Sequence, residues 1–330
     1  MNPKQNPFCA ELCSTAGEEM SGTVSFANVW VLLEYSKPWG KKIINDSDLS
    51  PEVKAHLSSL KKAIPGSKLL FIKQAPAIRE YITLFVIVCR ETEPCIYEVH
   101  LKSYEELLEL DLNKIILGEA QHSGTLIDHP LFLVCTHGKY DPCCAKYGTG
   151  VYRSMRNYVG NRSWQTSHVG GHRFAANVVC LPHGIFYGRV TEDEVKPIVD
   201  EYTQQHIYLN KFRGRACYPR PVQVGESFVR AQSGLTDLGG LDLLDANEAA
   251  DEKTWHVRFG SARDGLIHEV KFLCVDTECG RPFRCGAEEE KSVVQYRLIS
   301  YSVDSESLPQ KSRCVLGSGQ YRNAGFDATH

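Results

Sequence analysis

The chain has 330 residues, a length typical of two or three domains. Hydrophobic residues make up 42% and charged residues 23%, which is the composition of a folded soluble protein and excludes a disordered or collagen-like chain. The 37 lysines and arginines against 40 aspartates and glutamates give a net charge of −3, without the basic excess or stripe that is typical of nucleic-acid binding. No apolar run reaches the roughly 20 residues that span a bilayer, and the N-terminus has no signal-like apolar core. We therefore expect a cytoplasmic protein that binds neither nucleic acid nor membrane.

Residues 1–125 are predicted to form a first α/β domain. Runs of apolar residues typical of buried strands lie at 29–35, 68–72 and 81–89. Apolar residues recur with helical spacing over 49–64, where Ser50 is a suitable N-cap and Pro51 a suitable first helical residue.

Residues 126–222 are predicted to form a second α/β domain. The expected order is strand, helix, hairpin and helix, at 131–135, 147–159, 177–190 and 191–202. Thr191 and Glu194 have the spacing of a capping box. Pro197 lies too deep for a comfortable first turn, so the last helix should kink or start late.

Residues 223–330 are predicted to form a β-rich extension. Alternating apolar residues indicate antiparallel strands near 255–259, 266–274 and 294–298. Asp264 and Gly265 are a hairpin signal between the first two of these strands. A short helix is expected within 234–252. The predicted fold class is α/β with a C-terminal antiparallel extension.

The chain has thirteen cysteines and no recognisable export signal, so we expect them in a reducing compartment. Clustered cysteines in such a compartment more often bind metal or perform redox chemistry than form disulfides. Within 38 residues the chain places Cys135, Cys143, Cys144, His168 and His172. The two histidines flank a Val-Gly-Gly sequence that lets the backbone bend tightly around a bound centre. Two thiolates and two imidazoles make a four-ligand set, although each residue alone could equally be a core or surface residue.

The ligand types leave the bound group open. A structural zinc ion suits two cysteines and two histidines, but the usual gap between its cysteines is two to four residues, and here Cys135 precedes Cys143 and Cys144 by seven or eight intervening residues. A 2Fe-2S cluster is wider, and the replacement of two cysteines by histidines on one iron is the ligand set of Rieske centres. Cys135 and His137 imitate half of the Rieske pattern, but no histidine follows Cys144 at the required spacing, so a conventional Rieske fold is not expected.

Long sequence runs resemble one known family. The run CTHGKYDPCCAKYG from Cys135 and the run HVGGHRFAANVVCLPHGIFYGRVTEDEV from His168 are similar to the sucrase/ferredoxin-like family, as are GTVSFANVWVLLEYSKPWGKK from Gly22 and FCAELC before it. The resemblance covers roughly residues 8–215. It implies two thioredoxin-like lobes, the first without a cluster, and a 2Fe-2S cluster in the second. The ligands that it implies are Cys135, Cys144, His168 and His172.

The resemblance also implies the activity, an electron carrier that works with a redox partner such as a flavin reductase and has no turnover of its own. The family pattern favours Cys144 over Cys143, which is then a bystander. One rival is a thioredoxin-type thiol-disulfide oxidoreductase using Cys135, Cys143 or Cys144, although the second lobe lacks a Cys-x-x-Cys motif. The other is a structural zinc protein. Further cysteines carry weaker hypotheses, a thiol pair at Cys9 and Cys13 and an extra zinc site at Cys274, Cys279 and Cys285.

The bis-histidine ligand set predicts coupling between electron and proton. An imidazole that binds iron through one nitrogen keeps a second nitrogen that can carry a proton, and reduction raises its proton affinity. We expect the midpoint potential to fall as pH rises, in a redox titration of the purified protein. Replacing either His168 or His172 with Cys should lower the potential and weaken this dependence. A potential independent of pH would show that both distal nitrogens are held by hydrogen-bond acceptors.

Overall fold

The first α/β unit contains a four-stranded sheet. The computed structural model describes residues 8–74, 80–119, 124–277, 283–287 and 292–305. The elements of this sheet are β1 (Val29–Glu34), α2 (Pro51–Ala63), β2 (Ser67–Lys73), β3 (Ile82–Val88) and β4 (Cys95–Leu101). β1 and β2 are parallel and joined by α2, while β3 is antiparallel to both β1 and β4. The spatial order is β2-β1-β3-β4. Smaller elements of this half are α1 (Cys9–Thr15), α3 (Leu112–Ile116) and the edge strand β5 (Thr125–Ile127).

The second unit repeats this connectivity. Its elements are β6 (Leu131–Cys135), α4 (Pro142–Val159), β7 (Ser163–Thr166), β8 (Val178–Leu181), β9 (Ile185–Tyr187) and α5 (Val195–Thr203). β6 and β7 are parallel and joined by α4, β8 is antiparallel to β6, and β9 is antiparallel to β8, which gives the order β7-β6-β8-β9. β10 (Phe212–Arg215) adds to β9. Both units therefore have the thioredoxin-like topology.

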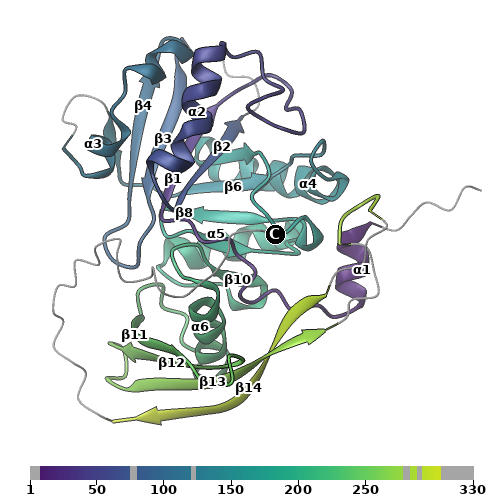
Figure 1. The fold of residues 1–330 in the computed structure, drawn as a ribbon, viewed down its shortest axis with the longest axis vertical. Coiled ribbons are helices and arrows are strands. Elements are labelled where there is room, and N and C mark those ends of the chain that lie inside the picture. The colour runs from purple at the N-terminus through teal and green to yellow at the C-terminus, as the bar shows by residue number, and fades with distance from the viewer. Residues whose placement is uncertain (1–7, 75–79, 120–123, 278–282, 288–291, 306–330) are drawn as a thin grey trace, which may run out of the picture.

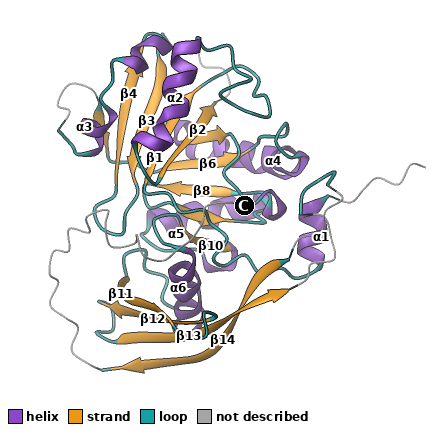
Figure 2. Cartoon of the chain, in the orientation of Figure 1, coloured by secondary structure: helices purple, strands orange, loops and turns teal. Residues whose placement is uncertain are grey.

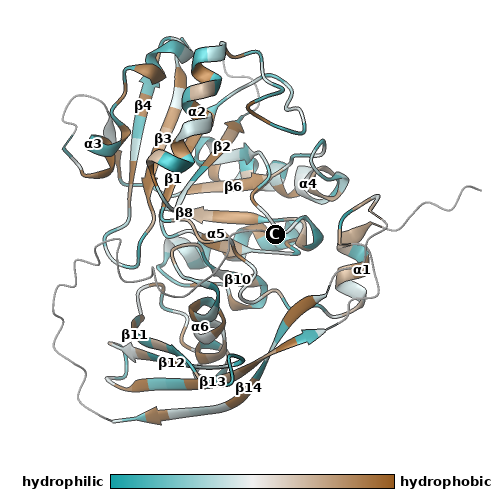
Figure 3. Ribbon diagram, in the orientation of Figure 1, coloured by the Kyte–Doolittle hydropathy of each residue, from teal (hydrophilic) through white to brown (hydrophobic). Residues whose placement is uncertain are grey.

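One antiparallel contact between the units makes a single sheet of ten strands within the described residues (Figures 1 and 2). β2 pairs with β7, Ile72 opposite Thr166 and Lys73 opposite Gln165. The strands overlap only at their C-terminal ends, so the loop after β1 and the loop after β6 come together. The strands are the most hydrophobic part of the ribbon (Figure 3), and side chains from both units share one buried cluster that includes Trp30, Leu133 and Trp164.

The C-terminal extension forms a separate four-stranded antiparallel sheet. Its strands, in spatial as in chain order, are β11 (Leu241–Glu248), β12 (Thr254–Ser261), β13 (Ile267–Thr277) and β14 (Val293–Asp304). The helix α6 (Arg220–Ser233) packs Val222 and Val229 against Val257 and Phe272 of this sheet. α6 spans the position between residues 222 and 223 where the sequence suggested a boundary.

Most predicted elements are confirmed, with clear local reasons. Ser50 caps α2 through its side chain, and Thr191 and Glu194 form the capping box. α5 starts only at Val195, the late start that Pro197 predicted. The prediction of a short helix within 234–252 is wrong. β11 occupies that segment because its backbone pairs with β12 along its length, and tertiary pairing overrides the weak local preference of a Gly- and Asp-rich stretch.

Gly148 sets how closely α4 approaches β6. A Cβ atom at this position would collide with the carbonyl oxygen of Cys135, a backbone atom that cannot rotate away. In an exposed helix interior, Gly→Ala stabilises by roughly 0.5–1 kcal/mol. At Gly148 the collision reverses the sign, because α4 must shift away from the strand.

We therefore expect Gly148→Ala to lower the free energy of unfolding by about 1–3 kcal/mol, measured by chemical denaturation. Gly239→Ala is the matched control, since nothing lies within 4 Å of a Cβ at that glycine. A stabilised Gly148→Ala protein would contradict the close approach.

Candidate metal centre

The candidate residues come together where β6 and β7 end and α4 begins. Cys135 is the last residue of β6 and is 1% exposed. Asp141 caps α4, its Oδ1 accepting a hydrogen bond of 2.9 Å from the Cys143 N–H, and Pro142 is the first helical residue. This start places Cys143 and Cys144 in the first turn of α4, where the sequence had suggested a loop. His168 and His172 lie in the segment after β7.

Three of the four predicted ligands form one group. Ligand atoms of Cys135, Cys144 and His168 all lie within 4.8 Å of one another, and Cys144 Sγ is 3.6 Å from His168 Nδ1. A hydrogen bond from the Cys144 thiol holds the pKa of Cys135 well below its usual range, against the effect of burial, and the same contact raises the pKa of Cys144. This shift favours the thiolate at Cys135, and the thiolate is the form of cysteine that binds metal.

The ring of His168 is held by its neighbours. Tyr140 stacks on it, with ring centroids 3.8 Å apart and planes at 13°. The backbone N–H of His168 donates to Nδ1 of His137 at 3.2 Å, while Nε2 of His137 donates to the carbonyl of Gly40 at 2.8 Å. Both nitrogens of His137 are used in this way, so His137 supports His168 and does not act as a ligand in this arrangement.

His172 lies next to the group but does not join it. Gly170 and Gly171 adopt φ of 103° and 71°, so the chain turns between the histidines through conformations that favour glycine. The ring centroids of His168 and His172 are 5.4 Å apart. Nε2 of His172 is 3.1 Å from the carbonyl of Phe283, whereas Nδ1 is buried without a hydrogen-bond partner. Burial lowers the pKa of His172 and favours the neutral imidazole that binds metals.

Cys143 faces a second group. Consecutive residues of a helix point about 100° apart, so Cys143 cannot share the direction of Cys144. Its sulfur lies 3.5 Å from Cys9 Sγ and 3.3 Å from Cys285 Sγ, and the carboxylate of Asp141 completes the group. Of the weaker sequence hypotheses, Cys13 instead donates to Glu18, Cys274 lies on β13 outside this group, and Cys279 lies outside the described residues.

The arrangement at Cys135, Cys144, His168 and His172 fits a bound metal group. A buried nitrogen without a partner is costly in a folded protein, and coordination through Nδ1 would satisfy the orphaned atom of His172. His172 does not join the compact group of the other three ligand atoms. The structure therefore brings three of the four predicted ligands together and places the fourth beside them.

Sequence reasoning missed several residues that shape this centre. Asp141, Tyr140 and Phe283 were not predicted to take part, and His137 was considered only as a ligand. The Asp-Pro pair at 141–142 carried a helix-start signal that could have placed both cysteines on the first turn. Phe283 acts through its backbone carbonyl, for which a sequence has no signal.

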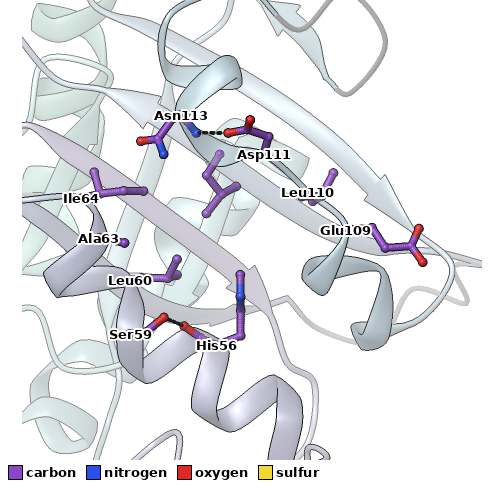
Figure 4. A pocket seen from close by; sticks show the side chains of 10 residues that line it. His56, Ser59, Leu60, Ala63, Ile64, Glu109, Leu110, Asp111 and Asn113 are labelled. Carbon is purple, nitrogen blue, oxygen red and sulfur yellow. Dashed lines mark hydrogen bonds between the residues drawn. The ribbon is translucent and has the colours of Figure 1, made fainter.

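One surface depression lies elsewhere, between α2 and the segment that enters α3. It is lined by His56, Ser59, Leu60, Ile64 and residues 109–113 (Figure 4). His56 is the one histidine among the residues that line the depression. The two acidic residues that line it, Glu109 and Asp111, belong to neither group of metal-binding side chains found among the described residues. None of the described helices has the length and hydropathy needed to cross a bilayer.

The chain is similar in part to curated proteins that share one name. The chain is 30% identical to Altered inheritance of mitochondria protein 32 of Meyerozyma guilliermondii over 137 residues, which are 38% of this chain and 46% of the relative. The protein of that name from Debaryomyces hansenii is 34% identical over 85 residues, 23% of this chain and 31% of the relative. Each match thus spans less than half the length of the curated relative. No solved structure matches the chain.

The family comparison covers the two thioredoxin-like units. Residues 20–214 match the family described as sucrase/ferredoxin-like, a span that begins before β1, ends in β10 and contains all four candidate ligands. Since this is more than half of the chain, the protein with its paired thioredoxin-like units and cysteine- and histidine-lined centre belongs to the sucrase/ferredoxin-like family.

Proposed function

We propose that the protein is an electron carrier with one 2Fe-2S cluster, bound by Cys135 and Cys144 on one iron and by His168 and His172 on the other. The observation that carries the proposal is the buried, unpartnered Nδ1 of His172 beside a compact group of three further donors, Cys135, Cys144 and His168. Such a cluster accepts and donates single electrons. The protein's part is to keep the donors deprotonated, oriented and shielded from water.

The contacts of the chain fit these tasks. Tyr140 and His137 fix the ring and the backbone of His168, and Phe283 accepts from Nε2 of His172, which leaves Nδ1 as the nitrogen for iron. Neutral imidazoles in place of two thiolates reduce the negative charge at the centre. The reduction potential should therefore be higher than that of an all-cysteine cluster in the same place.

Burial argues against the thiol-disulfide rival. That reaction requires a thiolate that a disulfide partner can reach. Cys135 has a lowered pKa, but it and Cys144 are 1% and 0% exposed, so their sulfurs are closed to a protein substrate. The structural zinc rival uses the same residues, and metal analysis separates it from the proposal.

The proposal extends to a partner and a location. His168 is the predicted ligand that is only half-buried, so electrons should enter and leave on the side where its ring faces solvent, towards a redox protein such as a flavin reductase. We also propose a cytoplasmic location, because clusters of cysteines that bind metal are typical of reducing compartments.

The ligand set is tested by variants of the adjacent cysteines. Cys135→Ser and Cys144→Ser each remove a thiolate and should reduce iron and acid-labile sulfide to background, with loss of the red-brown colour. Cys143→Ser is the matched control and should retain the cluster, since its sulfur faces Cys9 and Cys285. Colour lost in Cys143→Ser and kept in Cys144→Ser would reverse the assignment. A wild-type protein without iron whose zinc is lost in Cys135→Ser would favour the structural zinc protein.

The supporting role of His137 generates a second test. His137→Leu removes the acceptor of the His168 N–H without touching a ligand. Loss of such a support usually weakens metal binding roughly 10- to 100-fold. We expect faster bleaching of the cluster by a chelator, followed by absorbance. Replacement of the exposed His129 by Leu is the control. Equal bleaching rates for the two variants would show that His137 does not support the site.

A further inference from the structure

A second group of metal-binding side chains lies beside the candidate cluster and shares no ligand with it. It consists of Cys9 at the start of α1, Asp141 and Cys143 at the start of α4, and Cys285 in the C-terminal extension. Cys9 and Cys285 are 276 residues apart in the chain, and their sulfurs lie 3.6 Å apart. Figure 1 shows α1 beside the short loop of the C-terminal extension, on the side of the molecule where α4 lies.

The three sulfurs form a nearly equilateral triangle. Their separations are 3.3, 3.5 and 3.6 Å. In a tetrahedral zinc site with Zn–S bonds of about 2.3 Å, thiolates lie about 3.8 Å apart, close to these values. A disulfide would join two sulfurs at about 2.05 Å and leave the third without a partner. The even spacing of three sulfurs therefore favours one shared ion over a disulfide pair.

The carboxylate of Asp141 supplies the fourth donor. Both of its oxygens lie 3.9 Å from Cys9 Sγ, and it also accepts from the backbone N–H groups of Cys143 and Cys285 at 2.9 and 3.1 Å. The carboxylate is 1% exposed; Nε2 of His172 lies 3.8 Å from it, and no lysine or arginine among the described residues forms a salt bridge with it. A buried negative charge of this kind is stabilised by a cation.

We propose that Cys9, Asp141, Cys143 and Cys285 bind one zinc ion, in a site separate from the iron-sulfur centre. Zinc binds thiolates together with a carboxylate, whereas copper(I) prefers purely soft ligands and magnesium or calcium purely oxygen ligands. On binding, the thiols release their protons to the solvent. Three thiolates and one carboxylate leave no position for substrate, so the site is structural.

The ion would fasten two distant segments to the start of α4. One is α1, and the other is residues 283–287, whose Phe283 carbonyl contacts His172 and whose Arg284 lies over the ring of Tyr140, 5.7 Å from its centroid. By binding Cys285, the zinc ion would hold residues 283–287 in place against His172 and Tyr140.

The experiment measures zinc and iron in the full-length protein purified without added metal or chelator. We expect one zinc per chain in the wild type, with X-ray absorption showing about three sulfurs at about 2.3 Å and one oxygen at about 2.0 Å. Cys285→Ser should lose zinc and keep iron. Cys274→Ser, a half-buried cysteine of the same extension outside the group, should keep both.

Other results would overturn the zinc site. Absence of zinc from the wild type, a coordination shell of nitrogen and oxygen only, or a disulfide between Cys9 and either Cys143 or Cys285 in anaerobically alkylated protein would each do so. Cys135→Ser separates this inference from the proposed function, because it should lose iron and keep zinc. Loss of zinc in Cys135→Ser, with zinc retained in Cys285→Ser, would place the ion in the first group and refute both.

Discussion

The buried carboxylate of Asp141 controls the geometry of both groups of metal-binding side chains. As the N-cap of α4 it accepts from the Cys143 N–H and sets the residue at which the helix begins. Burial raises the pKa of Asp141, but backbone hydrogen bonds from Cys143 and Cys285 and the nearby His172 outweigh it and keep the pKa below its usual range. The lowered pKa favours the negatively charged form of the Asp141 side chain. Because the helix starts at a fixed residue, Cys143 and Cys144 both lie in its first turn, where consecutive side chains point about 100° apart. Cys144 therefore faces Cys135, and Cys143 faces Cys9.

The parts of the fold that the sequence predicted are those with local signals. Ser50 with Pro51, and Thr191 with Glu194, carry their capping chemistry within four residues, so α2 and the start of α5 could be placed without knowledge of the rest. α6 was missed for the opposite reason. Its Glu226 and Arg230 are buried, and Glu226 pairs with both Arg215 and Arg230, so positions that face the protein look like an exposed face in the sequence.

The candidate centre divides in the same way. The residues Cys135, Cys144 and His168 could be chosen from a single stretch of 34 positions together with the family resemblance. The partners of Cys143 could not, because Cys9 and Cys285 reach it across 134 and 142 residues. Contacts of that separation follow from the packing of α1 and the C-terminal extension onto the second lobe, and a periodic pattern or a short motif does not encode them.

The first lobe has a task that follows from the antiparallel contact of β2 with β7. Since these strands overlap at their C-terminal ends, the loop after β1 lies against the loop after β6, and there Gly40 accepts from His137 while Trp39 packs edge-on against its ring. The corresponding end of the first lobe is closed by its own side chains. Tyr35, which follows β1 as Thr136 follows β6, donates to Asp48, and its ring stacks on Phe71. The first lobe thus supports the candidate metal centre of the second lobe through a single histidine. Gly40 of the first lobe fixes the ring of His137, and that ring accepts a hydrogen bond from the backbone of His168.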